Sequence, residues 1–173
     1  MKKKTALSLA ILTLIPLLLL TACGSSGVDV PDGMKLVSSD AEAFYLFVPG
    51  TWVPNDSSGI ASAYYSDKDR SNVSLTCMVP TDVTTLDGYV EKCRAAAIPN
   101  YAPVGEVTDA VLGERNGKSF EYTSSIADVN YKYRQIVVIY KNMFYIFTYT
   151  STPEGYDLHA DEVEQIIAKV KFK

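Results

Sequence analysis

The chain has 173 residues, of which 47% are hydrophobic, and its 16 basic and 20 acidic residues give a formal net charge of −4. This length is enough for one domain with a substantial core. The acidic balance makes nucleic acid a poor partner, because binding to a phosphate backbone depends on clustered basic residues.

The first residues have the layout of an export signal. Met1 is followed by three lysines, and residues 6–20 form an uncharged run rich in leucine and isoleucine. This run is shorter than the ~20 residues that a membrane-spanning helix needs. Residues 1–22 are therefore predicted to be a signal peptide that is removed from the mature protein.

A cysteine stands directly after this segment. Leu20-Thr21-Ala22-Cys23 resembles the bacterial lipobox, in which a small residue precedes an invariant cysteine. The resemblance implies that Cys23 is the lipidation site, carrying a diacylglyceryl group with palmitate-type chains, and becomes the new N-terminus. Two acyl chains give stable anchoring that one chain does not. The alternative is an ordinary signal peptide with a chance cysteine.

Cleavage after residue 22 changes the charge of the chain. The remaining residues contain 13 basic and 20 acidic side chains, a formal net charge of −7. A domain of this charge is expected to be held at a bacterial cell membrane, on its outer side, by lipid rather than by surface charge. Residues 23–33 are small, polar and interrupted by Pro31, so they are predicted to be a flexible tether with a reach of roughly 20 Å.

Residues 34–173 are expected to form a single domain in which strands dominate. Aromatic and β-branched runs, bounded by turn residues, carry the strand predictions. Asn116-Gly117 is a hairpin signal, and Lys141-Asn142 is expected to join the last two strands. The predicted strands cover residues 44–48, 60–65, 72–79, 104–114, 118–126, 131–140 and 143–150.

The last of these runs has apolar side chains on both faces. Tyr145, Phe147 and Tyr149 point one way, and Phe144 and Ile146 point the other. Strands of this kind are typically central in a sheet and covered on both sides.

Two helices could supply that cover. Thr84-Thr85-Leu86-Asp87 is similar to a capping signal, and apolar residues follow at helical spacing as far as Ala97. The second helix begins near Asp157 and has an apolar stripe that ends at Val170. Strands, helix, strands and helix in this order predict a layered α+β domain with an antiparallel sheet.

Several stretches in order resemble the PsbP family. Residues 44–52 are similar to its Y-x-x-x-x-P-x-x-W opening, residues 72–75 to its N-V-x-V strand, and residues 117–122 to its G-R-x-x-Y hairpin arm. The tail over residues 140–172 is similar to its closing hairpin strand and helix. The resemblance implies an α/β/α sandwich, an antiparallel sheet with helices packed on both faces. Plant members bind photosystem II and help it to retain calcium and chloride, and cyanobacterial relatives are lipoproteins.

The sequence offers little catalytic chemistry. It contains no G-x-S-x-G elbow, P-loop or H-E-x-x-H motif. The single histidine, His159, lies near Asp157, Asp161 and Glu162 and could bind a metal with one of these acids, with His159, Asp157 and Asp161 as the weak candidates. A surface histidine is the favoured interpretation, since zinc sites need three or four ligands. The protein is therefore expected to be neither an enzyme nor a cofactor carrier.

A cluster of charged residues precedes the strand at residue 72. Residues 67–72 read Asp-Lys-Asp-Arg-Ser-Asn, which has acids spaced as at the start of a calcium loop. The EF-hand glycine and the glutamate at the twelfth position are missing. This segment is predicted to be a solvated turn between two strands.

Two cysteines remain in the domain. Cys77 shares a predicted strand face with Leu75 and Val79, and Cys93 lies on the apolar stripe of the first helix. A disulfide between them is sterically reasonable and suits an exported protein. The alternative is that both are buried, reduced and packed as small hydrophobic residues.

A last candidate site is a run of tyrosines and basic residues. Tyr131, Tyr133 and Arg134 could form a contact surface, since tyrosine and arginine are enriched at interface hot spots. Packing of the tyrosines within the sheet is the alternative. The leading hypothesis is a lipid-anchored, extracytoplasmic, non-catalytic accessory protein that contacts a partner in a membrane complex. The alternative is a small-ligand or metal-binding module that serves a transporter or sensor.

Overall fold

The computed structural model describes residues 27–95, 98 and 100–173. The predicted signal peptide over residues 1–22, the acylation of Cys23 and the helical position of Ala97 lie outside this range. Among the described residues, no helix has the length and apolar character needed to cross a membrane.

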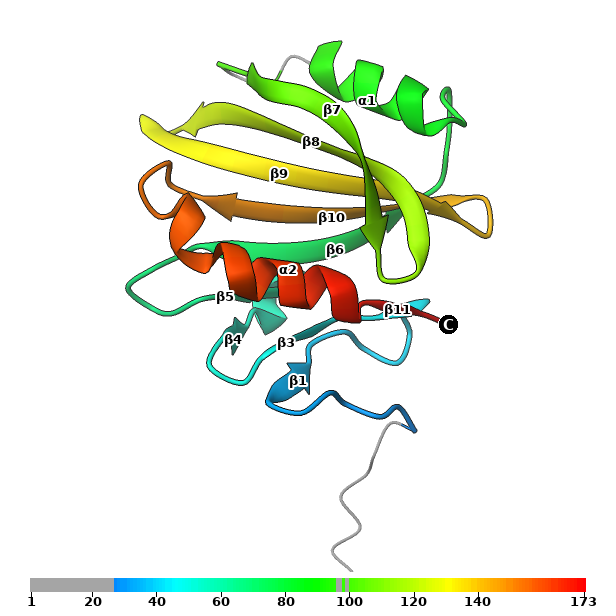
Figure 1. Cartoon of the computed structure of the whole chain (residues 1–173), viewed down its shortest axis with the longest axis vertical. Helices are drawn as coiled ribbons and strands as arrows, with labels where there is room; N and C mark the ends of the chain where they lie inside the picture. Colours follow the sequence, from blue (N-terminus) through cyan, green and yellow to red (C-terminus); the bar gives the residue numbers. More distant parts are fainter. Residues whose placement is uncertain (1–26, 96–97, 99) are drawn as a thin grey trace, which may run out of the picture.

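A seven-stranded antiparallel sheet forms the body of the fold, in the order β4-β5-β6-β10-β9-β8-β7 (Figure 1). Two small antiparallel sheets pair β1 (Met34–Leu36) with β3 (Phe47–Pro49), and β11 (Lys171–Phe172) with β2 (Phe44–Tyr45). The strands of the large sheet are β4 (Val53–Pro54), β5 (Ala61–Tyr64), β6 (Asn72–Met78), β7 (Ala102–Leu112), β8 (Arg115–Ile126), β9 (Val129–Tyr140) and β10 (Met143–Ser151).

β10 is a central strand that is buried on both sides. Tyr145, Phe147 and Tyr149 belong to one hydrophobic cluster, whereas Phe144 and Ile146 belong to a second. The alternation follows from strand geometry, because successive side chains point to opposite faces. The prediction that this run is central and apolar on both faces is confirmed.

Each helix contributes to one of these clusters. α2 (Ala160–Lys169), which follows a short 3-10 helix η2 (Tyr156–His159), buries Val163, Ile166 and Ile167 in the cluster that contains Phe147. α1 (Leu86–Ala95) buries Tyr89 and Val90 in the cluster that contains Phe144.

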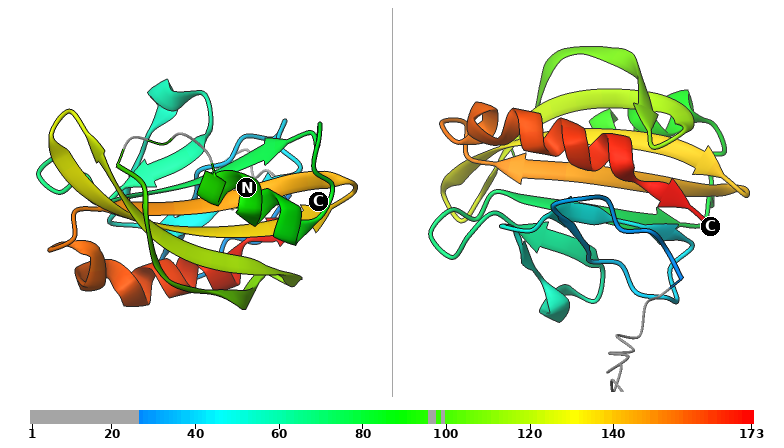
Figure 2. Two further views of the ribbon diagram at one scale, coloured as in Figure 1. Left: turned by 90° about the horizontal axis from the view of Figure 1, so that it is seen from above. Right: turned by 60° about the horizontal axis from the view of Figure 1, so that its bottom comes forward.

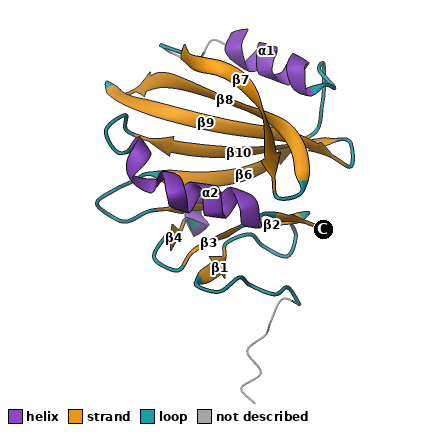
Figure 3. Cartoon of the chain, in the orientation of Figure 1, coloured by secondary structure: helices purple, strands orange, loops and turns teal. Residues whose placement is uncertain are grey.

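α1 begins where the capping signal predicts, because the Thr85 hydroxyl accepts a hydrogen bond from the Gly88 amide at 3.1 Å. Figure 2 shows α2 lying along the large sheet, and α1 packs on β8 and β9. Strands are far more extensive than helices in the described fold (Figure 3), so the α+β prediction holds with strands in the larger share.

The segment over residues 44–49 divides between the two small sheets. β2 pairs with β11, β3 pairs with β1, and Leu46 lies between them with its amide donating to the Ser38 hydroxyl at 3.0 Å. The sequence predicts one strand here. It shows a continuous apolar run but not the change of partner at Leu46, because that depends on distant segments.

The predicted Asn116-Gly117 hairpin is wrong. The turn between β7 and β8 lies at Gly113 and Glu114, and Asn116 and Gly117 pair with Val111 and Ala110 inside the ladder. Gly113 has a φ of +59°, a left-handed conformation that glycine adopts without strain. The Lys141-Asn142 turn is confirmed, and both of its residues have positive φ, as a type I′ turn requires.

The end of the predicted tether is part of the fold. The Met34 amide donates to the Pro31 carbonyl at 3.0 Å, and the Gly50 amide donates to the Gly33 carbonyl at 2.8 Å. The ordered structure therefore begins before residue 34, the start of the predicted domain.

Candidate functional site

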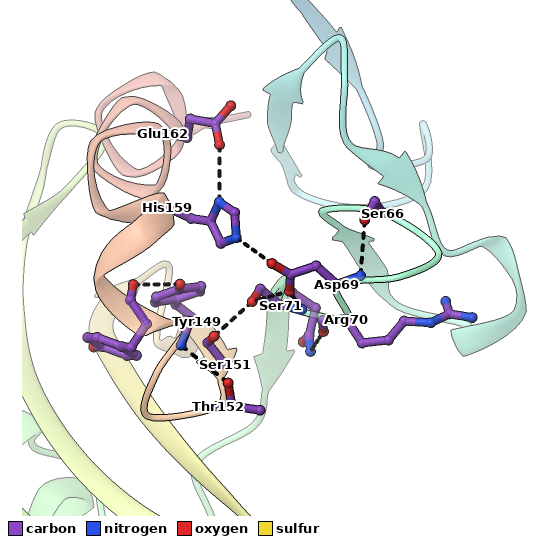
Figure 4. Close-up of polar contacts among 12 residues, drawn as sticks. Ser66, Asp69, Arg70, Ser71, Tyr149, Ser151, Thr152, His159 and Glu162 are labelled. Atoms are coloured by element: carbon purple, nitrogen blue, oxygen red, sulfur yellow. Dashed lines mark hydrogen bonds and ion pairs between the residues drawn. The ribbon is translucent and has the colours of Figure 1, made fainter.

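Three segments meet where β10 ends and β6 begins (Figure 4). They are the loop from Ser66 to Ser71, the loop from Thr152 to Gly155, and the start of the closing helix at His159. We call this region the loop end of the sheet.

Asp69 is the centre of a hydrogen-bond network at the loop end. Its Oδ1 accepts from the Ser71 amide at 2.9 Å and from the Ser71 hydroxyl at 2.6 Å. Its Oδ2 lies 2.8 Å from Nε2 of His159, which must donate because an ionised carboxylate only accepts. The Asp69 amide donates to the Ser66 hydroxyl at 3.0 Å. The carboxylate thus holds its own loop and the closing helix together.

A buried serine extends this network into β10. The hydroxyls of Ser71 and Ser151 are 2.7 Å apart. The only hydroxyl hydrogen of Ser71 is donated to Asp69. In the bond between the two serines, Ser151 must therefore be the donor. Both serines are buried. We call Asp69, Ser71, Ser151 and His159 the Asp69 clamp.

His159 is buried, so the predicted surface position is wrong. Only 6% of the residue is exposed, and its ring lies 3.9 Å from the Tyr65 ring centroid and 6.1 Å from the Trp52 ring centroid. Its Nδ1 is 3.6 Å from a carboxylate oxygen of Glu162. Of the three acids near it in the sequence, only Glu162 forms an ion pair with it among the described residues, and its second acidic partner is Asp69 rather than Asp157 or Asp161.

The pKa of Asp69 results from opposing effects. Burial raises this pKa, but the hydrogen bonds from Ser71 and His159 outweigh burial and hold the pKa below its usual value. The carboxylate is therefore ionised at neutral pH, as the clamp requires.

The clamp does not have the geometry of a nucleophile with its base. In such a pair the serine hydroxyl donates to the imidazole, whereas here Ser71 donates to Asp69, which separates it from His159. Among the residues that the structure describes, no three His, Cys, Asp or Glu side chains are grouped so as to hold a metal ion. The arrangement suits a fastening between loops.

A cavity of about 420 Å³ opens beside the clamp. Its polar lining combines two cationic side chains with several hydroxyl groups. The lining residues are Lys68, Asp69, Arg70, Ser71, Tyr131, Ser151, Thr152 and Gly155.

The predicted surface of Tyr131, Tyr133 and Arg134 is divided between the two faces of the sheet. Arg134 forms an ion pair with Glu164 of α2 and donates to the Ser119 hydroxyl. The two tyrosines point to the opposite face, as strand alternation requires. The prediction is therefore wrong for Arg134, which holds α2, while the tyrosines remain candidates for contact.

These tyrosines belong to a half-exposed, uncharged area of the sheet. Tyr133 stacks on Tyr122 of the next strand, with ring centroids 4.7 Å apart and an interplanar angle of 8°. On the other side, Gln135 donates to the Thr148 hydroxyl of β10 at 3.4 Å. We call this area the tyrosine face, and its residues are Tyr131, Tyr133, Gln135, Thr148 and Thr150.

Cys77 and Cys93 are both free, and they face different clusters. Cys77 is exposed and pairs across the strands with Tyr145, so it shares the face of the cluster that contains Phe147. Cys93 packs against the cluster that contains Phe144, where burial raises the pKa of its thiol. The sheet separates the two side chains, so the structure does not contain the disulfide that the sequence suggested.

Comparison with known proteins gives a fold but no family. No protein-family model and no curated protein sequence matches this chain. The solution structure of CyanoP, the PsbP of Synechocystis sp. PCC 6803, has a TM-score of 0.55 and 14% identity, over 89% of this chain and 99% of that chain.

Two crystal structures are similar to a comparable degree. LpqN of Mycobacterium tuberculosis, a protein involved in cell envelope biogenesis, has a TM-score of 0.54 and 13% identity, over 81% of this chain and 90% of that chain. PA94 of Pseudomonas aeruginosa, a protein of unknown function, has a TM-score of 0.54 and 16% identity, over 79% of this chain and 94% of that chain. At such identities the likeness shows the fold alone, and this chain has a PsbP-like fold.

Proposed function

We propose that the protein is a lipid-anchored, extracytoplasmic accessory protein that binds a membrane-associated partner and catalyses no reaction. The lipobox-like sequence that ends at Cys23 supports the anchor. The shared fold of CyanoP and of LpqN, which is involved in cell envelope biogenesis, supports a role outside the cytoplasm.

The tyrosine face is the observation that carries the binding role. Its side chains are half exposed, and tyrosine is enriched at protein interfaces. The neighbouring β8–β9 hairpin tip adds Ile126 and Val129, which are 60% and 43% exposed. Aromatic, aliphatic and uncharged polar groups side by side suit a protein partner better than a charged ligand.

The Asp69 clamp supports this role by stiffening the edge of the proposed binding surface. It fixes the loop that contains Lys68 and Arg70, and this loop lines the same cavity as Tyr131. A surface that is already ordered loses less conformational entropy on binding, which favours affinity.

Substitution of both tyrosines tests the proposal. In Tyr131→Ala/Tyr133→Ala, we expect at least roughly tenfold less partner to be captured from detergent-solubilised membranes, as for loss of hot-spot residues. The measurement is affinity capture of the full chain with quantitative mass spectrometry. Tyr45→Ala is the matched control, because Tyr45 is also half-buried but lies in β2, outside the tyrosine face.

Unchanged capture by the double variant, with its circular dichroism spectrum intact, would contradict the proposal. It would favour a second candidate, a small-ligand module that serves a transporter or sensor. The cavity beside Lys68 and Arg70 is the observation that supports this alternative, because its two cations and several hydroxyl groups suit a small anion, and the oxygens of its one carboxylate, Asp69, are already hydrogen-bonded within the clamp.

A further inference from the structure

Five basic residues gather at the end of the sheet opposite the loop end. They surround β11, the β7–β8 turn and the β9–β10 turn, which lie on one side of the molecule in Figure 1. We call this group the basic end, and its members are Arg115, Lys141, Lys169, Lys171 and Lys173.

Aromatic rings and main-chain oxygens hold several of these cations in place. The Arg115 guanidinium lies 4.5 Å from the Tyr140 ring centroid, and the Lys141 ammonium lies 5.1 Å from it. Lys141 also donates to the terminal main-chain oxygen of Lys173 at 2.9 Å. Within the described part of the chain, no ion pair with Asp or Glu includes any of the five. Their charge is therefore not cancelled by direct pairing with an Asp or Glu side chain.

Lys169 and Lys171 stand between two surface grooves. One groove, of about 350 Å³, is shared with Glu114 and Arg115. The other, of about 520 Å³, is shared with the segment from Asp29 to Asp32. Both lysines are exposed, and the acids of the two grooves lie beside them without forming ion pairs.

The second groove links the basic end to the anchor. Its residues 29–32 lie just after Gly27, the first described residue. Four peptide units separate Gly27 from Cys23, and each spans ~3.8 Å between Cα atoms, so the two residues are at most about 15 Å apart. An acyl chain on Cys23 would therefore enter the bilayer close to Lys169 and Lys171.

We infer that the basic end is a docking surface for anionic lipid headgroups. The inference rests on the proposed acylation of Cys23. Lysines at an anionic bilayer surface are attracted within about a Debye length, and an acyl chain together with a basic patch binds more firmly than either alone. Docking there would turn the loop end away from the bilayer, which leaves the tyrosine face free for a partner.

The net charge of the chain, taken alone, argues against binding to anionic headgroups. The formal charge of −7 for residues 23–173 predicts repulsion from anionic headgroups. The fold, however, places five of the 13 basic residues of this segment at the end where the tether joins the domain, against three acids in the two grooves, Asp29, Asp32 and Glu114, so the local balance is positive. Headgroups within a Debye length sense this local charge rather than the total.

Lysine footprinting tests the inference on the full acylated chain in lipid nanodiscs. In discs that contain phosphatidylglycerol, we expect acetylation of Lys169 and Lys171 to be slower by roughly fivefold than in phosphatidylcholine discs. The difference should disappear at ~1 M salt, where the Debye length is ~3 Å. Lys68, at the loop end, should react equally in both lipids.

Charge-reversal variants provide a second test of the headgroup inference. In Lys169→Glu/Lys171→Glu, the lipid dependence of Lys141 and Lys173 acetylation should be lost, whereas Lys68→Glu/Arg70→Glu should retain it. Equal protection in both lipids would overturn the headgroup inference while leaving the anchor in place. A chain that does not remain with the discs would overturn the anchor and this inference together.

Discussion

Asp69→Ala is expected to lower the free energy of unfolding by about 2–4 kcal/mol. The substitution leaves the Ser71 amide, the Ser71 hydroxyl and His159 Nε2 without their shared acceptor. His159 and Ser71 are buried, so water replaces these bonds poorly. The Asp69 side chain is itself 35% exposed, so the expected loss of unfolding free energy is smaller than for a fully buried ion pair.

Denaturant titration at neutral pH measures this effect, and Asp67→Ala is the matched control. Asp67 lies in the same loop but is exposed and has one long contact, from the Tyr64 hydroxyl at 3.3 Å. Its loss should change the free energy of unfolding by no more than about 0.5 kcal/mol. Equal destabilisation by both variants would show that the loop, rather than the clamp, is being disturbed.

The stabilities of the native chain and of Asp69→Ala should depend differently on pH. The folded state lowers the pKa of Asp69, so its stabilising contribution is present above the unfolded-state pKa, about 3.9. This contribution is lost as the pH falls through the lower, folded-state pKa. The difference in the free energy of unfolding between the native chain and Asp69→Ala should therefore become smaller below about pH 4.

Gly117→Ala should be strongly destabilising, although it adds only one methyl group. A Cβ built at this position would lie 2.2 Å from the Val137 carbonyl oxygen and 2.6 Å from a Val138 methyl group. Because the first contact is with backbone, β8 or β9 must shift, and the expected cost is about 3 kcal/mol or more. Thermal unfolding followed by circular dichroism measures it.

Gly27→Ala is the control for glycine replacement, because a Cβ there would meet no atom within 4 Å. Its melting temperature should match that of the native chain. If Gly117→Ala also melted at the native temperature, the close packing of β8 on β9 at this position would be contradicted. If the variant failed to accumulate in folded form, the close packing would be supported.

Much of the fold can be read from local patterns. Phe144 and Ile146 alternate with Tyr145 and Phe147, and this period of two is enough to identify a central strand. The Thr85 cap and the positive-φ turn at Asn142 are also local, since the residues that make them are adjacent in the chain. These predictions succeed because short-range geometry decides them.

The failures have a different cause. Asn116-Gly117 has ideal hairpin composition, but Gly117 is needed where β9 approaches closely, and Gly113 supplies the turn instead. Cys77 continues an apolar alternation but is exposed towards the end of β6. Alternation predicts a face of the sheet and not how far the core extends over it.

The candidate site shows the same limit. The bond from the Ser71 amide to Asp69 is local, and Asp-x-Ser is a pattern that could have suggested it. The bond between Ser71 and Ser151 and the bond between Asp69 and His159 span 80 and 90 residues. The acids next to His159 in the sequence therefore indicated Glu162, three residues away, but not Asp69, because that contact depends on how distant loops meet.

Membrane attachment through Cys23 underlies both the proposed function and the role of the basic end. Intact-mass analysis of protein extracted from the native membrane tests it most directly. The expected mass is that of residues 23–173 plus a diacylglyceryl group, with Cys77 and Cys93 both available to a thiol reagent after unfolding. Recovery of an unacylated chain from the soluble fraction would contradict the attachment, and with it the proposed function.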